Sequence, residues 1–293
     1  MSVERPADIS AQVHADFARA RSRAFLHDLW ALLSGTRNSL LSYDEVKEKL
    51  RIGGPIYRGV RTVEVAKIVG SVNRYRDFDH AFLPARNNIA DRWQRVDRAF
   101  YEEVSLPPVV LYEVGDIYFV VDGHHRVSVA REQGQEFIEA EVRECKVNVP
   151  VGPDLRPEDL EILGAKVEFL ERTGLDRLRP GARIDLTVPD GYDRILEHIA
   201  VHRYFMGLDQ QRDISEEEAV AHWYDTVYLP IVKVIRERGV LEEFPGRTEG
   251  DLYLWVLDRQ QFLHDHGEDL APPASAAEEY VQRLDDSPQL GEF

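Results

Sequence analysis

One stretch of the sequence, residues 107–134, constrains the fold more than any other. Two apolar runs, 109–112 and 117–121, are separated by Gly115 and Asp116, which predicts a β-hairpin. The second run reaches Gly123, and helical spacing resumes at once after it. The chain is therefore expected to pass from a buried strand, through a glycine, directly into a helix.

The rest of the chain divides by composition near Pro150. We expect helices over 11–33, 43–50 and 88–101 and strands over 62–69 and 138–142 before that point. After it the pattern is mostly helical, over 157–173, 191–206, 215–237, 248–266 and 275–284. Four segments are predicted: a helical extension (1–55), an α/β domain (56–150), a helical domain (151–285) and a mobile tail (286–293).

Several helix starts carry capping residues. Ser42 precedes Glu45 by three residues, and Ser215 precedes Glu218 by the same interval, as in the capping box. Thr248 is followed by Asp251 in a looser variant of this pattern. Ser275 precedes Glu278 in the same way. These pairs predict where four of the helices begin.

The charge of the chain is unevenly distributed. The formal net charge is −17, and residues 1–150 hold 21 Lys and Arg against 22 Asp and Glu, whereas residues 151–293 hold 15 against 31. This excess of acid argues against a broad nucleic-acid surface. Residues 51–100 hold ten basic residues against five acidic ones, which favours a local anion site or an ordinary solvated helix face.

The single cysteine, Cys145, excludes a disulfide framework and is typical of a reducing compartment. No apolar run is long enough to span a bilayer, and the N-terminus lacks the pattern of a signal peptide. We therefore expect a cytoplasmic protein without a membrane partner.

The turn after the second apolar run has the composition of an anion site. Backbone N–H groups at a helix start, together with the helix dipole, attract phosphate. Gly123 permits close approach of the backbone, while polar side chains supply further donors. The candidate ligand-binding residues here are Gly123, His124, His125, Arg126 and Ser128. The alternative is that Asp122 merely caps the helix.

Residues 122–130, Asp-Gly-His-His-Arg-Val-Ser-Val-Ala, follow Leu106-Pro107-Pro108 and precede Gly134. This pattern resembles the nucleotide-binding signature of the ParB/sulfiredoxin superfamily, and the likeness extends over residues 60–144. The remainder resembles an uncharacterised bacterial helical domain. The resemblance implies an α+β fold: a small mixed β-sheet domain with flanking helices, plus an α-helical C-terminal domain.

The branches of that superfamily differ at this turn. Sulfiredoxin has its catalytic cysteine at the position of His124, so its repair reaction is not expected here. ParB, which binds CTP, shares the equivalents of Gly123 and Arg126 but lacks the two histidines. The free-serine kinases carry a similar Asp-Gly-His-His-Arg motif, and in them the acidic residue matched by Asp122 would bind Mg²⁺ or orient the attacking hydroxyl.

The resemblance also suggests further site residues. Asp122, His124 and Glu64 are the candidate catalytic residues, with Asp77 and Asp79 as alternatives to Glu64. The region that contains Arg74 closes over the nucleotide in the superfamily, so Arg74 is a candidate nucleotide ligand or part of a surface loop. Asp122 is the candidate metal ligand.

A separate pair, His198 and His202, has the helical spacing of two Zn²⁺ ligands. The adjacent Glu197 does not follow the first histidine as it does in the metalloprotease motif, and no third ligand is evident. Packed or surface histidines are the alternative reading, and the one that the sequence favours.

Two functions remain open. The first is a phosphotransferase or nucleoside-triphosphate hydrolase that uses ATP, ADP or CTP with Mg²⁺, with a small-molecule acceptor in the case of transfer. The second is a nucleotide-responsive regulatory or DNA-associated protein without turnover. The acidic C-terminal half and the absence of a recognisable helix-turn-helix pattern count against nucleic acid as a partner. Self-association, the identity of the nucleotide and the role of the helical domain are left open.

Overall fold

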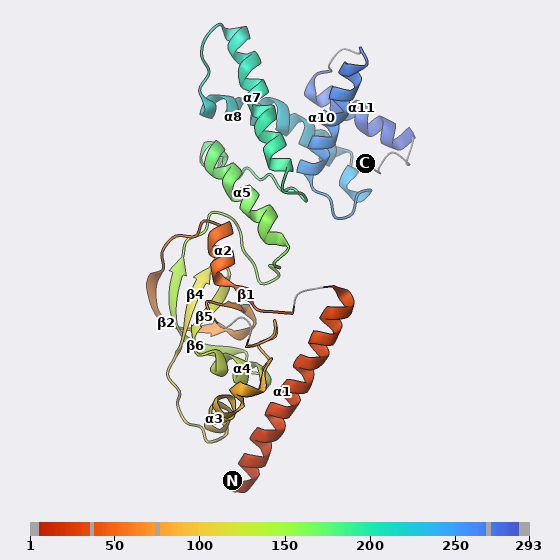
Figure 1. The fold of residues 1–293 in the computed structure, drawn as a ribbon. Helices are drawn as coiled ribbons and strands as arrows, with labels where there is room; N and C mark the ends of the chain where they lie inside the picture. Colours follow the sequence, from red (N-terminus) through yellow and green to blue (C-terminus); the bar gives the residue numbers. More distant parts are fainter. Residues whose placement is uncertain (1–5, 36–37, 74–76, 268–270, 287–293) are drawn as a thin grey trace. The chain divides into compact units, whose positions relative to one another are not determined.

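The computed structural model describes residues 6–35, 38–73, 77–267 and 271–286. The chain divides into two compact units, Met1–Leu160 and Glu161–Phe293 (Figure 1). The first unit contains every strand of the described chain, and the described part of the second contains only helices and their connections. The predicted fold class, a mixed sheet with flanking helices plus a helical C-terminal region, is confirmed.

A six-stranded mixed sheet forms the centre of the first unit, in the order β1-β3-β5-β4-β6-β2. The β4/β5 and β2/β6 pairs are antiparallel, and the other neighbours are parallel. The strands are β1 Leu41–Ser42, β2 Ile56–Glu64, β3 Ile68–Ser71, β4 Val109–Val114, β5 Ile117–Asp122 and β6 Phe137–Cys145. Because β3 and β5 are parallel neighbours, their C-terminal ends, Ser71 and Asp122, lie at the same edge of the sheet.

The predicted hairpin is confirmed as β4 and β5, and the predicted returning strand is confirmed as part of β6. The predicted strand over 62–69 is wrong as a single element. It covers the end of β2, a short 3₁₀ helix at Val65–Lys67 and the start of β3. Since β2 pairs with β6 and β3 pairs with β5, the chain must leave one part of the sheet and re-enter another within these few residues.

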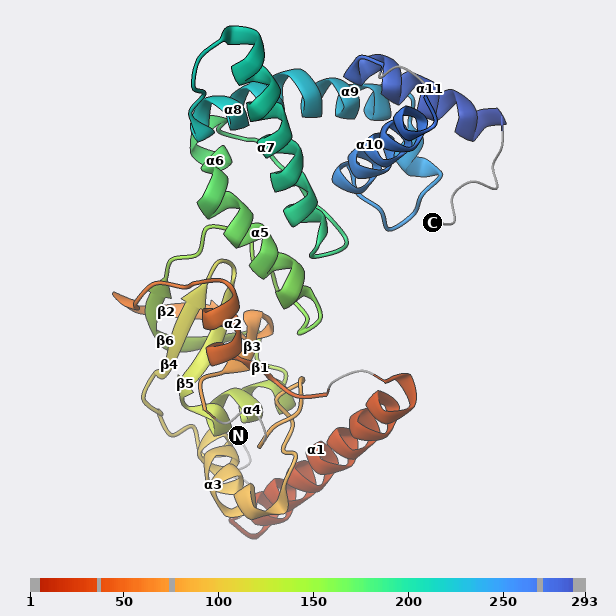
Figure 2. The same ribbon diagram turned by 45° about the horizontal axis from the view of Figure 1, so that its top comes forward.

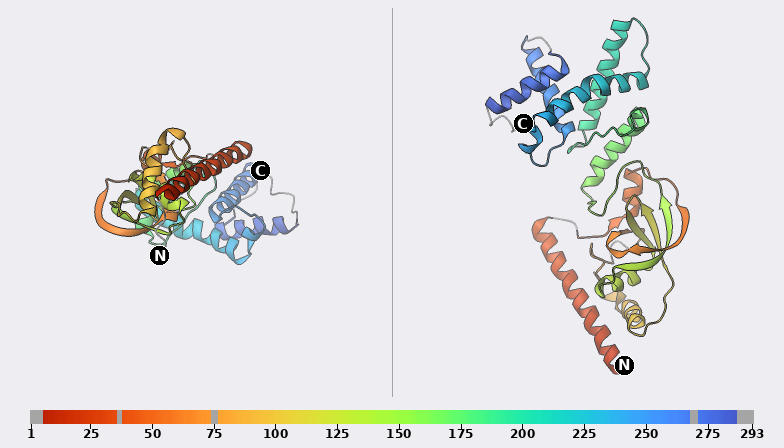
Figure 3. Two further views of the ribbon diagram at one scale, coloured as in Figure 1. Left: turned by 90° about the horizontal axis from the view of Figure 1, so that it is seen from below. Right: turned by 180° about the vertical axis from the view of Figure 1, so that it is seen from behind.

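Four α-helices accompany the sheet in the first unit: α1 Pro6–Ser34, α2 Tyr43–Lys49, α3 Ala90–Tyr101 and α4 His124–Glu132. The Ser42 hydroxyl caps α2 by accepting a hydrogen bond from the Glu45 N–H at 3.5 Å, as predicted. A 3₁₀ turn at Asn87–Ile89 leads into α3. Helix α3 packs against both α1 and α4 (Figures 1 and 3).

Helix α1 changes character along its length. Its first half buries Phe17, Ala20 and Ala24, and the Phe17 ring meets the edge of Trp93 on α3 at 5.5 Å. The apolar side chains of its second half are exposed: Phe25, Leu26, Leu29, Trp30, Leu32 and Leu33. Apolar residues recur at helical spacing through the whole of 11–33, so the sequence gives no sign of this change. A helix of 12 residues such as α3 spans only about 18 Å, so it cannot cover a helix of 29 residues.

The second unit is a bundle of helices whose starts were partly predictable (Figure 2). Ser215 caps α8 through the Glu218 N–H at 3.2 Å, and Thr248 with Asp251 forms a complete capping box on α10. The start predicted at Ser275 is wrong, because α11 begins at Pro273. The predicted helix 215–237 contains an unforeseen π-helical turn at Tyr224–Tyr228. The elements are α5 Asp159–Thr173, α6 Leu175–Leu178, α7 Gly191–Gln210, α8 Glu216–Trp223, α9 Leu229–Glu237, a 3₁₀ turn Val240–Glu242, α10 Glu249–Asp265 and α11 Pro273–Asp286.

Aromatic side chains from α8, α10 and the π-helical turn form the centre of this unit's core. Trp223, Tyr228 and Tyr253 are almost fully buried, and Trp223 Nε1 donates to the Tyr253 hydroxyl at 3.0 Å. No described helix combines the length and the apolarity needed to cross a membrane. The predicted tail 286–293 lies outside the described residues except for Asp286.

Candidate functional site

The strand-to-helix turn at the end of β5 depends on a glycine. Gly123 is the N-cap of α4 and has a left-handed φ of 100°. A Cβ at this position would lie 2.6 Å from Val109 Cγ1, so the backbone there approaches β4 too closely for any other residue. The first bond within the helix runs from the Val127 N–H to the Gly123 carbonyl. The N–H groups of residues 124–126 therefore have no acceptor within the helix.

These N–H groups belong to residues that line a cleft of about 300 Å³. The cleft lies between the end of β5, the start of α4 and the adjoining face of α3. The other lining residues are Asn73, Arg92, Val96, Leu106, Pro107, Val121, Asp122 and Gly123. Arg92 is exposed and forms no ion pair with another described residue. A helix N-terminus and a guanidinium thus border the same small cleft, an arrangement that favours an anion.

The Arg126 side chain forms its hydrogen bonds with other parts of the protein. Its Nη2 donates to Asp122 Oδ2 at 2.8 Å, and its Nη1 donates to the carbonyl oxygens of Pro107 and of Pro108, the latter at 3.0 Å. The Arg126 side chain is 15% exposed, whereas that of Asp122 is 65% exposed. Arg126 therefore fixes the carboxylate of Asp122 and the 107–108 segment at the rim of the cleft.

The two histidines of the motif are buried, each 5% exposed. His124 Nε2 lies 2.8 Å from the Ser71 hydroxyl at the end of β3, and the His124 ring stacks parallel to Phe78. The His125 ring meets Phe78 edge-on at 5.5 Å. The parallel pairing of β3 with β5 brings Ser71 to His124, and the loop after β3 supplies Phe78, so both rings have fixed orientations.

Ser128 has a different environment. Its hydroxyl accepts a hydrogen bond of 2.8 Å from Trp93 Nε1, and both residues are fully buried between α3 and α4. Ser128 is not among the described residues that line the cleft. The structure gives it a role in joining the two helices that form the cleft.

The other predicted site residues lie elsewhere. Glu64, at the end of β2, is half exposed, lies 3.5 Å from Lys67 and lines a separate cavity of about 620 Å³. Asp79 is buried with its carboxylate bonded to its own loop, and Asp77 lies 4.0 Å from Arg86. Arg74 is outside the described residues. Asp122 is thus the one carboxylate among the described residues of the cleft.

Neither helix-capping by Asp122 nor a metal site at His198 and His202 is seen. Gly123 occupies the cap position, and the Asp122 side chain bonds Arg126 instead. His198 packs against Tyr253, and burial lowers its pKa to about 4. His202 Nε2 lies 2.8 Å from Nδ1 of His222. No metal-binding group of three among the described residues includes any of these histidines.

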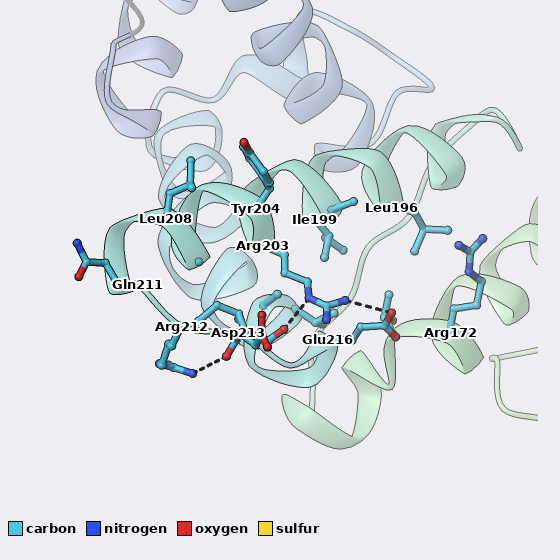
Figure 4. A pocket seen from close by; sticks show the side chains of 16 residues that line it. Arg172, Leu196, Ile199, Arg203, Tyr204, Leu208, Gln211, Arg212, Asp213 and Glu216 are labelled. Carbon is cyan, nitrogen blue, oxygen red and sulfur yellow. Dashed lines mark hydrogen bonds and ion pairs between the residues drawn. The ribbon is translucent and has the colours of Figure 1, made fainter.

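A cavity of about 1090 Å³ lies wholly within the second unit (Figure 4). It is bordered by α7, α8 and the end of α5. Two of its three arginines are engaged: Arg203 donates to the Ile214 carbonyl and to Glu216, and Arg212 pairs with Glu218. Arg172 is the third arginine of the lining, and the rest is largely aliphatic, including Leu196 and Ile199. This cavity offers volume, but two of its cations are already paired with acids.

Sequence reasoning missed Arg92 as a cleft residue, because the basic residues of 51–100 fitted an anion site and an ordinary solvated helix face equally well. Arg92 and Arg95 are indistinguishable by pattern, since both are exposed positions of one helix. Only the packing of α3 against α4 brings Arg92 to the cleft while Arg95 donates to the Asp91 carbonyl of its own helix. The helix pattern carries no signal that separates them.

No family model matches the chain, and no curated protein matches it in sequence. Among solved structures, the C-terminally truncated chromosome-partitioning protein ParB from Caulobacter crescentus, in complex with CTP-γ-S, is similar at 14% identity. That match covers 76% of this chain and 99% of that chain with a TM-score of 0.23. A Pnob8-like ParB-N domain matches at 12% identity, over 67% and 87% of the two chains, with a TM-score of 0.20. Values this low do not establish a common family.

Proposed function

We propose that the cleft at the start of α4 binds the phosphate groups of a nucleotide. The observation that carries this proposal is the juxtaposition of the α4 N-terminus, opened by Gly123, with the exposed guanidinium of Arg92. Backbone N–H groups without intrahelical acceptors bind phosphate oxygens, and an arginine adds two parallel hydrogen bonds. The sequence resemblance of residues 122–130 to a nucleotide-binding signature favours a nucleotide over a simple anion.

Within this proposal the motif residues have distinct tasks. The N–H groups of residues 124–126 and Arg92 hold phosphate oxygens. Arg126 positions the rim through Pro107 and Pro108 rather than contacting the ligand. The buried rings of His124 and His125 give the first turn of α4 a rigid base against Phe78. Arg74 remains a candidate nucleotide ligand.

The donor set also fits Mg²⁺. This ion is commonly held by one or two carboxylates together with nucleotide phosphates and water. Asp122 supplies one exposed carboxylate at the rim of the cleft, with Oδ2 oriented by Arg126. Bound Mg²⁺ would neutralise phosphate charge. Asp122 would hold the ion and Arg92 the phosphate oxygens, so that the two residues together would orient the ligand.

The catalytic form of the proposal is phosphoryl transfer to a hydroxyl of a small molecule, or to water. It rests on the Asp-Gly-His-His-Arg likeness to the free-serine kinases and on Asp122, which would orient the metal or the attacking hydroxyl. Phosphoryl transfer depends mainly on positioning and on charge neutralisation, for which such a site is suited. His124 is the other candidate catalytic residue in this reaction, and contacts with Ser71 and Phe78 hold its ring in one orientation.

A second candidate, nucleotide sensing without turnover, is favoured by a specific observation. Asp122 is the one carboxylate among the described cleft residues and is already paired with Arg126. A site that binds and does not turn over its nucleotide needs no second acid. We do not extend this candidate to DNA binding, because the charge of residues 151–293 is strongly negative.

Two variants of one helix test the binding proposal. The full chain is titrated with ATP, ADP, CTP and GTP, each with Mg²⁺, by calorimetry and by thermal shift. Arg92→Glu is expected to weaken binding at least tenfold, because it replaces a phosphate ligand by a like charge. Arg95→Glu is the matched control, since Arg95 is exposed on the same helix but does not line the cleft.

Binding of at least one nucleotide, lost in Arg92→Glu and kept in Arg95→Glu, supports the proposal. Absence of any stabilisation at millimolar nucleotide overturns it, because a ligand at 100 times its Kd stabilises by about 2.7 kcal/mol. Equal weakening by both variants also overturns it, since it would reveal a general charge effect. Product formation in the same samples then separates turnover from sensing.

A further inference from the structure

Three potential metal ligands from separate parts of the chain meet beside α1. His27 belongs to the exposed half of that helix, whereas Asp79 and His80 lie in the loop after β3. His27 Nδ1 is 2.8 Å from Asp79 Oδ2, and the two imidazole rings lie 5.2 Å apart. One ligand atom from each of the three residues lies within 4.8 Å of the other two. The group is separate from the cleft at the start of α4.

The carboxylate of Asp79 is held in place by its own loop. Asp79 is 1% exposed, and its Oδ1 accepts hydrogen bonds from the N–H groups of Ala81 at 3.0 Å and Leu83 at 2.7 Å. Oδ2 is the atom directed at His27. Such fixation of one carboxylate oxygen by outer hydrogen bonds is typical of carboxylates that bind a metal through the other.

His80 is oriented in a similar way. The Asn38 amide donates to Asp28 Oδ1 at 2.6 Å, so its oxygen is turned toward His80 Nδ1 and accepts a hydrogen bond there. The proton of neutral His80 therefore resides on Nδ1, and Nε2 keeps its lone pair.

We propose that His27, Asp79 and His80 bind a divalent transition-metal ion of the Zn²⁺ type. Two imidazoles and one carboxylate are a donor set that suits Zn²⁺ and its first-row neighbours, and not Mg²⁺ or Ca²⁺. Ligands about 2.0 to 2.2 Å from a tetrahedral Zn²⁺ lie about 3.4 Å from one another, so small side-chain movements close the present set around an ion. A water molecule would complete the coordination.

The position of the site suggests its purpose. Ala24 is the last buried residue of α1 among those described, and the apolar side chains beyond it are exposed. His27 follows by one helical turn, where apolar packing no longer holds the helix against the domain. A metal bound by His27 and by the 79–80 loop fastens α1 at this point.

The test compares matched histidine variants of the full chain. Each protein is stripped with EDTA, dialysed against Zn²⁺ and analysed for bound metal; Co²⁺ is used in parallel for its visible absorption. The wild type is expected to bind one more equivalent of Zn²⁺ than His27→Ala or His80→Ala, with affinity in the variants reduced tenfold or more. His14→Ala, an exposed histidine of the same helix, should match the wild type.

Metal bound at other histidines cancels in this comparison because it is common to all four proteins. Equal stoichiometry and affinity in the wild type and in folded His27→Ala overturn the proposal and leave a simple His–Asp hydrogen bond. Circular dichroism in EDTA checks folding. Because His27 is partly exposed and His80 is exposed, both variants are expected to fold, and a folded variant of either histidine decides the question alone.

Discussion

Arg126 Nη2 lies 2.8 Å from Asp122 Oδ2, one helical turn away across the start of α4. The pair joins the last residue of β5 to the first turn of the helix, and Arg126 also bonds the carbonyls of Pro107 and Pro108. The same contact orients the one carboxylate that borders the cleft among the described residues. The chemistry proposed for Asp122 therefore depends on Arg126, which holds the Asp122 carboxylate in its orientation.

Replacing Asp122 by Asn separates metal binding from phosphate binding. The amide oxygen of Asn still accepts a hydrogen bond from Arg126, so the turn is expected to persist. Nucleotide affinity without Mg²⁺ should be unchanged or slightly higher, whereas the gain in affinity produced by Mg²⁺ should disappear. Any turnover should fall at least 100-fold. Calorimetry with and without Mg²⁺ measures the first effect, and product assays measure the second.

Asp116→Asn is the control for this change, because Asp116 is an exposed carboxylate at the opposite end of β5 that pairs with Lys67. It should leave both quantities at wild-type values. Turnover that is equal in Asp122→Asn and in the wild type would remove Asp122 from the mechanism.

Replacing Gly123 by Ala tests the close approach of the turn to β4. The alanine would have to adopt the left-handed φ of Gly123, and its Cβ would lie 2.6 Å from Val109 Cγ1. The two effects together should lower the free energy of unfolding by about 2 to 4 kcal/mol and weaken nucleotide binding. Gly134→Ala is the matched control, since Gly134 is also left-handed but has nothing within 4 Å of its Cβ position.

The Gly134 variant should lose only about 1 kcal/mol. Chemical denaturation of both variants measures the difference. Equal losses would show that contact with Val109 adds nothing beyond backbone strain.

Local patterns were the predictable part of this protein. The alternation of apolar residues, the glycine after β5 and the caps at Ser215 and Thr248 are each specified by neighbours in sequence, and the structure confirms them. The motif at residues 122–126 could be placed at a strand-to-helix turn for the same reason. The role of Arg126 could not be predicted, because two of its three partners, the carbonyls of Pro107 and Pro108, lie almost twenty residues away.

Tertiary pairing decided what sequence patterns could not. Residues 62–69 read as one strand because β-branched residues continue through the break between β2 and β3. Glu64 was a reasonable second acid on that reading, yet the path of β2 takes it to another cavity. The cluster of His27 with Asp79 and His80 joins residues more than fifty positions apart, and neither periodicity nor spacing signals it.

Ser128 offers a test that separates packing from ligand contact. Removing its hydroxyl in Ser128→Ala leaves the Trp93 indole N–H buried without its acceptor, which should cost about 1 to 3 kcal/mol of stability. The nucleotide Kd of the folded protein should stay within twofold of the wild type. Chemical denaturation and calorimetry measure the two quantities.

Ser10→Ala controls for loss of an exposed hydroxyl that also accepts a hydrogen bond, here from Arg98 on α3, and should cost less than about 0.5 kcal/mol. A fall in nucleotide affinity without loss of stability in Ser128→Ala would instead make Ser128 a ligand residue.

Asp97 gives the first unit a pH dependence whose direction follows from its burial. It is fully buried in α3; its Oδ1 accepts a hydrogen bond from Gln133 at 2.8 Å, and its Oδ2 has no partner among the described residues. Burial raises its pKa from 3.8 to about 6, with a smaller contribution from the charge of Glu132. Between these values the folded state holds a proton that the unfolded state has lost, so stability falls as the pH rises.

The variant Asp97→Asn isolates this contribution. The free energy of unfolding of the wild type minus that of the variant should decrease by about 2 kcal/mol as the pH rises from 4 to 7, and should level off above pH 7, where both states are ionised. Asp91→Asn, an exposed position on the same helix, should show no such trend. Urea titrations at each pH measure the three proteins. A difference that is independent of pH between 4 and 7 would mean that Asp97 ionises in the folded protein as it does in the unfolded chain.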